Sequence, residues 1–170
     1  MLMLLRHLIA ILLLPFVVVV VVPAWLLNTS TSGGVLWGDS SPVAWLLRLA
    51  GTLPFTAGFA LFAWCVSLFV RVGRGTLAPW DPTRNLVIVG PYRHVRNPMI
   101  SGVVAMLFGE ALLWGSLAVG LWACVFLIIN QFYFVLSEEP GLEQRFGDPY
   151  RVYKANVPRW IPRLKPWRGE

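Results

Sequence analysis

The sequence predicts an all-α integral membrane protein, a helical bundle of about four transmembrane helices with short amphipathic surface helices near its C-terminal end. Three observations favour this class. Hydrophobic residues make up 57% of the 170 residues and charged residues only 13%, whereas soluble domains carry about 25% charged residues. The mean hydropathy is +0.68. The apolar residues gather in four runs, and the length allows one bundle, so we expect a single domain over residues 1–170.

The four apolar runs cover residues 8–27, 45–70, 99–114 and 117–136. A helix needs about 20 apolar residues to cross a hydrocarbon core of about 30 Å, so each run is predicted to be a span, the third being short or tilted. The first run is long for a signal peptide and has no small-residue cleavage site after it. Gly115 and Ser116 separate the last two runs, which predicts a tight helical hairpin.

The basic residues indicate how the chain is oriented in the membrane. Of the 14 Lys and Arg residues, all but Arg6 and Arg48 fall in the loop between the second and third runs or in the C-terminal tail, and the other two connections have none. Basic segments stay on the cytoplasmic side, so we expect a multi-pass protein with both termini in the cytoplasm. The net charge is +6. Because the basic residues are interleaved with apolar runs, membrane lipids are favoured over nucleic acid as the partner of this protein.

The tail after residue 136 is predicted to form surface helices. Ser137 is placed to cap a helix with Glu138 and Glu139 in its first turn, where the helix dipole favours acids. Apolar residues then recur every three to four positions from Leu142 to Val157, an amphipathic pattern. We expect two short helices, broken at residues 147–149, that cover the basic loop.

No metal site is expected. Cys65 and Cys124 both lie inside apolar runs and are predicted to be small buried hydrophobic residues. His7 and His94 are far apart and stand alone. Asn130 and Gln131 are interpreted as hydrogen-bond partners between helices.

Two polar signatures flank the hydrophobic hairpin. Residues 90–98 read Gly-Pro-Tyr-Arg-His-Val-Arg-Asn-Pro, and the last run is followed by Glu138-Glu139 and then by Phe-Gly-Asp-Pro-Tyr at residues 146–150. A protein that only anchors itself in lipid has no need of such a dense set of Arg, Asn and Glu side chains at its helix ends. The pattern predicts an active site at the membrane surface, on its cytoplasmic side.

This order of motifs resembles the superfamily of isoprenylcysteine carboxyl methyltransferases and phospholipid methyltransferases. The resemblance covers residues 85–163 and rests on an Arg-x-Pro signature followed downstream by Glu-Glu. It implies an integral membrane enzyme that uses S-adenosyl-L-methionine, with the cofactor-binding region at about residues 84–163. It also implies a lipophilic small molecule or a lipid as methyl acceptor. Because methyl transfer is a one-step displacement, such an enzyme mainly aligns its substrates and excludes water.

The resemblance assigns residues to the site by motif position. The catalytic group is Arg96, Asn97 and Glu138. The expected cofactor contacts are Arg84, Asn85, Leu86, Val87, Tyr92, Asn97, Pro98, Met99, Ile100, Glu138 and Glu139.

Three positions depart from the family pattern. Asn97 replaces the usual His and cannot titrate, and Ile100 replaces the usual Tyr. Phe134 stands where the carboxyl methyltransferases place an arginine that pairs with the substrate carboxylate. We therefore expect a retained cofactor site and an altered acceptor site, to which we assign Phe134. Glu110 is a second acceptor-site candidate, because an acid inside an apolar run is costly and usually functional.

The leading interpretation is methyl transfer to a lipophilic or lipid-like acceptor, in the manner of the isoprenylcysteine carboxyl methyltransferases. One alternative is a phospholipid N-methyltransferase, which performs the same chemistry on an amine. A second is an NADPH-dependent enzyme like the membrane sterol reductases, and a third is a membrane scaffold without catalysis.

Trp160 and Trp167, next to basic residues, are interpreted as surface anchors.

Overall fold

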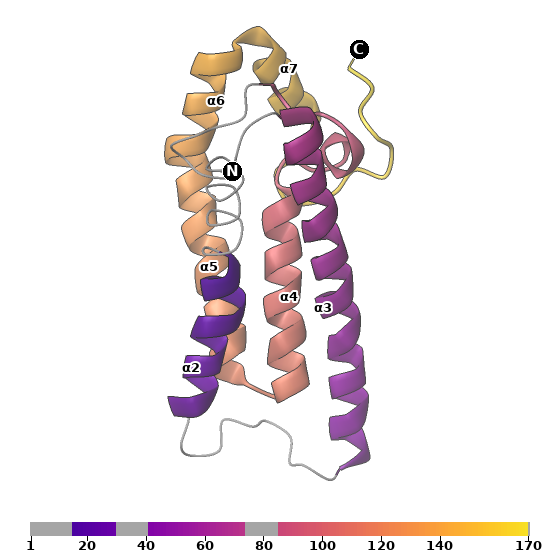
Figure 1. The fold of residues 1–170 in the computed structure, drawn as a ribbon. Coiled ribbons are helices and arrows are strands. Elements are labelled where there is room, and N and C mark those ends of the chain that lie inside the picture. Colours follow the sequence, from indigo (N-terminus) through magenta and orange to yellow (C-terminus); the bar gives the residue numbers. More distant parts are fainter. Residues whose placement is uncertain (1–14, 30–40, 74–84, 170) are drawn as a thin grey trace, which may run out of the picture.

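The computed structural model describes residues 15–29, 41–73 and 85–169, and within them the chain is built from helices (Figure 1). None of the elements in these ranges is a strand, which confirms the all-α class. The elements are η1 (Val17–Val21), α2 (Val22–Thr29), α3 (Pro42–Leu68), η2 (Phe69–Gly73), η3 (Gly90–Arg93), α4 (Pro98–Trp114), α5 (Leu117–Tyr133), η4 (Phe134–Glu138), α6 (Glu139–Phe146) and α7 (Asp148–Asn156).

Two continuous helices are long and apolar enough to cross a membrane, Pro42–Gly73 and Leu117–Phe146. They contain the second and fourth predicted spans. The other two apolar helices, Val17–Thr29 and Pro98–Trp114, are shorter. Residues 8–14 of the first predicted span lie outside the described residues. The structure thus supports a helical membrane protein, and the count of four spans stays a prediction.

Glycines allow α3 and α4 to lie side by side along their length, as Figure 1 shows. A Cβ atom built on Gly58 would stand 2.5 Å from the carbonyl oxygen of Gly102, and one on Gly51 would stand 2.8 Å from that of Gly109. Such distances leave no room for a side chain. Small residues that let helix backbones approach closely are a common basis of helix association in membranes.

The predicted hairpin between α4 and α5 is confirmed. Gly115 ends α4 in the left-handed conformation, with φ of 64°, which glycine adopts without steric cost. The next residue, Ser116, caps α5, because its hydroxyl accepts a hydrogen bond of 3.3 Å from the N–H of Val119. The two helices therefore run antiparallel with a minimal turn between them.

The predicted helix start at Ser137 is wrong. The chain continues from α5 through the π-turn η4 into α6 as one helix. In this turn the N–H of Glu139 donates to the carbonyl oxygen of Phe134, so the backbone hydrogen bonding is not interrupted and no cap is required. Glu138 and Glu139 thus extend a long helix rather than open a new one.

The break between α6 and α7 is confirmed at Gly147, which has φ of 60°. The apolar side of the two helices forms a cluster in which Tyr150, Tyr153 and Val157 are buried. Residues packed around this cluster include Leu86 of the segment before η3. The C-terminal helices therefore cover one end of the bundle (Figure 1).

The two cysteines differ from each other. Cys65 is buried as predicted, whereas Cys124 is exposed on α5. The prediction for Cys124 is wrong because an apolar run does not show which side of its helix faces the bundle. A helix in a small bundle keeps an outward face, which in a membrane contacts lipid.

Candidate functional site

A cavity of about 660 Å³ lies where the four apolar helices meet the C-terminal helices. This volume is within the range of about 300–1,000 Å³ found for small-molecule sites. Its walls come from the first helix, from α3 and η2, from the segment before α4, from α4 itself, from the continuous helix of α5, η4 and α6, and from α7. The lining residues are Pro15, Val18, Phe62, Phe69, Leu86, Val87, Tyr92, Arg96, Asn97, Met99, Ile100, Val103, Phe126, Ile129, Asn130, Tyr133, Phe134, Ser137, Glu138, Glu139, Gly141, Leu142, Arg145, Tyr150 and Tyr153.

The cavity has a polar part and an apolar part. Phe126 and Glu138 both line it and lie twelve positions apart on one continuous helix, which corresponds to about 18 Å along the axis. Near Phe126 the walls are mainly hydrocarbon, with Val18 and Val103 as neighbours in the lining. Charged and amide groups gather at the Glu138 end. The cavity can therefore accept a molecule with a polar head and an apolar body.

Most of the residues assigned from the sequence line this one cavity. From the motif side they are Leu86, Val87, Tyr92, Arg96, Asn97, Met99 and Ile100, and from the continuous helix Phe134, Glu138 and Glu139. Segments separated by about forty positions in the chain thus meet across a single space.

Other assigned residues lie elsewhere. Arg84 is outside the described residues. The amide of Asn85 donates a hydrogen bond of 3.1 Å to the carbonyl oxygen of Val72, and Asn85 does not line the cavity. Pro98 is wholly buried in the first turn of α4. These two residues support the cavity wall rather than form it.

Glu110 is also outside the cavity lining. It is 9% exposed, and its Oε2 atom has no hydrogen-bond partner among the described residues. It lies on α4 seven positions beyond Val103, the last residue of α4 that lines the cavity. The structure therefore does not bring Glu110 to the other candidate residues.

Asn97 precedes α4 and presents an unused amide. It occupies the N-cap position, but its side chain makes no capping hydrogen bond. Its backbone carbonyl accepts from both the N–H and the hydroxyl of Ser101. Since Asn97 lines the cavity, its amide is available there both to donate and to accept.

Tyr92 is held in the wall by Tyr153. The hydroxyl of Tyr153 donates a hydrogen bond of 2.7 Å to the backbone carbonyl of Tyr92. Both rings are buried, and burial raises the pKa of each phenol well above its ordinary value. Both hydroxyls therefore remain protonated near neutral pH and act as neutral hydrogen-bonding groups.

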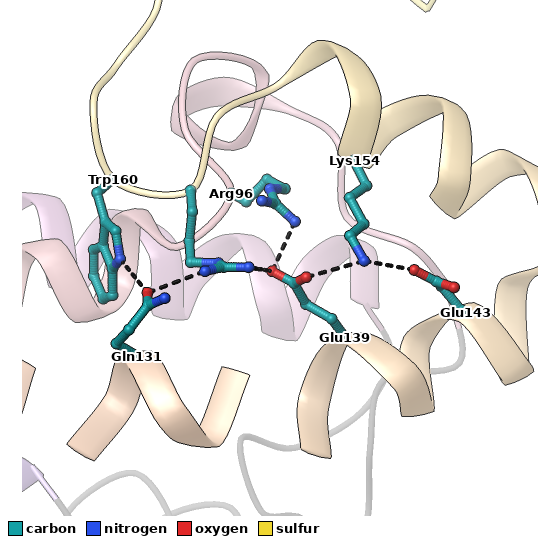
Figure 2. A network of polar contacts seen from close by, with 7 residues as sticks. Arg96, Gln131, Glu139, Glu143, Lys154 and Trp160 are labelled. Atoms are coloured by element: carbon teal, nitrogen blue, oxygen red, sulfur yellow. Dashed lines mark hydrogen bonds and ion pairs between the residues drawn. The ribbon is translucent and has the colours of Figure 1, made fainter. Parts of the chain in front are cut away.

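Glu139 is the centre of a charged network (Figure 2). Its carboxylate is 2.8 Å from Nη1 of Arg96, 2.7 Å from Nη2 of Arg159 and 3.2 Å from Nζ of Lys154. Lys154 also contacts Glu143 at 2.7 Å, and the carboxylates raise the pKa of its ammonium group. With three cationic partners, Glu139 is neutralised by the protein itself.

Glu138 differs from its neighbour in this respect. It lines the cavity, yet among the described residues it has no hydrogen-bond or ion-pair partner. Arg96 offers a complementary group, because its buried Nε atom has no hydrogen-bond partner within the described ranges. Among the described residues, the polar part of the cavity thus holds a carboxyl group without a partner and, although the guanidinium of Arg96 is paired with Glu139, one N–H of that guanidinium without an acceptor. These two groups fit a ligand that has both an amino group and a carboxylate.

Residues 157–167, which we call the tail segment, hold residues 90–97 in place. We call residues 90–97 the motif loop. Three backbone hydrogen bonds of 2.9 Å join the two, from the N–H groups of Arg96, Arg163 and Trp167 to the carbonyl oxygens of Pro158, His94 and Arg93 respectively.

Several residues that shape the site are not among those predicted from the sequence. Phe62 and Phe69 line the cavity from α3 and η2, and their seven-residue spacing is the helical signal that could have placed them on one face. Trp160, interpreted as a surface anchor, is partly buried and contacts a residue of the cavity wall. Its ring packs on Phe134 at a centroid distance of 5.6 Å, and its N–H donates to Gln131.

Comparison with known proteins identifies the family. The family described as phospholipid methyltransferase matches residues 47–149, a range that includes the first polar signature, the second one up to Pro149, and most of the cavity wall. The chain belongs to the phospholipid methyltransferase family. This membership agrees with the resemblance seen in the motifs.

Two curated relatives of this phospholipid methyltransferase family member show partial similarity. A phosphatidylethanolamine N-methyltransferase of Zygosaccharomyces rouxii is 31% identical over 98 residues, which are 54% of this chain and 11% of the yeast protein. An uncharacterized protein of Haemophilus influenzae is 54% identical over 35 residues, 21% of this chain and 54% of that protein. The matches thus span only part of each relative. No solved structure matches.

Proposed function

We propose that this protein transfers a methyl group from S-adenosyl-L-methionine to the amine headgroup of a membrane lipid. One observation carries the proposal. A single cavity has unpaired polar groups at one end and hydrocarbon walls at the other, within the range that matches the phospholipid methyltransferase family. An amphiphilic acceptor and a polar cofactor can meet in such a space.

The residues present fit the cofactor. S-adenosyl-L-methionine supplies an electrophilic methyl group and carries an amino group, a carboxylate and a flat adenine. Glu138 is suited to accept from the amino group, and Nε of Arg96 is suited to donate to the carboxylate. The amide of Asn97 and the aromatic ring of Tyr92 stand beside them in the lining.

The acceptor side of the cavity suits an amine better than a carboxylate. Phe134 lines the cavity and puts an aromatic ring at the position where a carboxyl methyltransferase requires an arginine. An aromatic ring attracts cations, and the carboxyl group of Glu138 lies one helical turn away. Bound S-adenosyl-L-methionine would supply the methyl group. Since a protonated amine has no lone pair, the headgroup would first pass a proton to water or to Glu138 before its nitrogen accepts that methyl group.

The test is transfer of labelled methyl from S-adenosyl-L-methionine by the purified protein in mixed micelles. Three acceptors are compared: phosphatidylethanolamine, a farnesylated cysteine analogue and phosphatidylcholine, whose quaternary nitrogen cannot be methylated. We expect saturable labelling of phosphatidylethanolamine and background labelling of phosphatidylcholine.

Robust methylation of the farnesylcysteine carboxylate, with phosphatidylethanolamine unlabelled, would replace this proposal with a carboxyl methyltransferase. Absence of transfer to any acceptor, together with tight binding of NADPH, would favour the reductase alternative instead. If the protein binds neither S-adenosylhomocysteine nor NADPH, the scaffold alternative gains support.

A further inference from the structure

Gln131 lies on α5 outside the cavity lining, and yet it is connected to the cavity wall. Its Oε1 atom accepts two hydrogen bonds from the tail segment, one of 2.8 Å from the indole N–H of Trp160 and one of 3.1 Å from Nη1 of Arg159 (Figure 2). A single half-buried side chain of a membrane-embedded helix thus binds two consecutive residues near the C-terminus.

The two residues that Gln131 binds each contact a residue of the cavity wall. Arg159 donates through Nε to Glu139 at 2.8 Å, and Glu139 is 5% exposed. Trp160 packs its ring on Phe134. Because Glu139 and Phe134 both line the cavity, displacement of Arg159 and Trp160 would release two points of its wall together.

The same contacts orient Arg96. Its guanidinium pairs with Glu139, and its backbone N–H donates to the carbonyl oxygen of Pro158, directly before Arg159. The guanidinium is thereby fixed with its Nε unpaired. The direction in which Arg96 can donate therefore depends on where residues 158–160 are held.

We propose that Gln131 is a positioning residue that docks the tail segment and so sets the ligand-binding geometry of Arg96 and Glu139. This role rests on the proposed function, since it concerns the same cavity. Gln131 acts through Arg159 and Trp160 and does not itself touch the ligand. The single acceptor oxygen of Gln131 suits a docking role, because its loss would leave the N–H groups of Arg159 and Trp160 without their acceptor at the same time.

The experiment measures binding of S-adenosylhomocysteine to the full-length protein in detergent by calorimetry. We expect Gln131→Leu to raise the dissociation constant about tenfold, the effect of losing one or two buried hydrogen bonds, with unchanged stoichiometry. Gln131→Glu keeps the acceptor oxygen, so we expect it to bind S-adenosylhomocysteine about as tightly as the wild type does. Trp160→Phe keeps the ring on Phe134 but loses the N–H, so we expect an intermediate effect. Gln144→Leu is the matched control, because Gln144 is exposed on α6 and outside the lining.

Amide hydrogen exchange provides a readout that does not depend on the ligand. In Gln131→Leu the amides of Arg96 and Arg163, which bond across the motif loop and the tail segment, should exchange faster than in the wild type. A lower stoichiometry with unchanged dissociation constant would indicate a purely structural residue and overturn the positioning role, as would unchanged affinity and exchange. If the wild type binds no S-adenosylhomocysteine, the proposed function fails, and the exchange rates still decide whether Gln131 docks the tail segment.

Discussion

Glu138 and Glu139 are adjacent in the chain and are predicted together as cofactor contacts, but their surroundings differ. Glu139 is engaged by Arg96, Arg159 and Lys154. Glu138 lines the cavity without such partners in the described part of the chain. We infer that Glu138 is the acid that meets a ligand and that Glu139 fixes the wall around it.

Replacing Glu138 tests this division. We expect Glu138→Gln to weaken binding of S-adenosyl-L-methionine by about 1–3 kcal/mol, the scale of a charge-assisted hydrogen bond, with little change in thermal stability because no protein partner is lost. Calorimetry in detergent measures the affinity. Asp148→Asn is the control, since Asp148 pairs only at the exposed surface with Arg151. Unchanged affinity in Glu138→Gln would remove Glu138 from the site.

Tyr153 supports the wall by a single buried hydrogen bond to the carbonyl oxygen of Tyr92. We expect Tyr153→Phe to lower the free energy of unfolding by about 1–2 kcal/mol, because it leaves that carbonyl without its donor. Thermal unfolding in detergent provides the measurement, and a variant as stable as the wild type would show that the bond contributes nothing.

Tyr153 is also expected to make the stability of the folded protein depend on pH. Burial raises the pKa of the Tyr153 hydroxyl above the ordinary value of 10.0. Above pH 10 the unfolded chain therefore loses this proton while the folded chain keeps it, so stability falls as the pH rises. Melting curves between pH 8 and 11 should show a smaller decline for Tyr153→Phe than for the wild type.

Among the elements, the close packing of α3 against α4 depends most directly on glycines, which have no side chains. The two helices are in backbone contact at Gly58 and Gly102 and again at Gly51 and Gly109. Since α3 contributes Phe62 to the cavity and α4 contributes Val103, the closeness of this pair also sets the width of the apolar part.

A single methyl group should separate these helices. We expect Gly58→Ala to destabilise the protein by about 1–3 kcal/mol, the cost of overpacking, because the two nearest atoms belong to the backbone and cannot turn away. Gly120→Ala is the matched control, since its Cβ would meet only Ala111 at 3.7 Å, an ordinary contact. Unfolding in detergent with equal stability for both variants would show that the close approach is not required.

At the scale of the whole molecule, the charge distribution makes a topological prediction that the helices alone do not test. If four spans are present and the basic segments are cytoplasmic, a cysteine probe at Ser32 is labelled from outside intact cells and one at Gly169 is not. The background carries Cys124→Ala, because Cys124 is exposed on α5. Labelling of Gly169, or of both positions, would overturn the four-span topology.

The sequence by itself determined the class of the protein, the approximate places of its apolar helices, the α4–α5 hairpin and the two motif segments of the site. These features are local. Hydropathy, a glycine that permits a left-handed turn and a run of motif residues can each be recognised within a window of about twenty positions. The family match at residues 47–149 agrees with this part of the prediction.

Only the tertiary structure decided which of these residues share a space. It separated Glu138 from Glu139 by their partners and left Glu110 outside the cavity lining. It also brought Gln131 of α5 together with Trp160 of the tail segment, 29 positions further along the chain. Each outcome depends on how far a helix is rotated about its axis and how closely it approaches the next one. A change of one residue turns a helix face by about 100°, so small differences in packing select the side chains that meet.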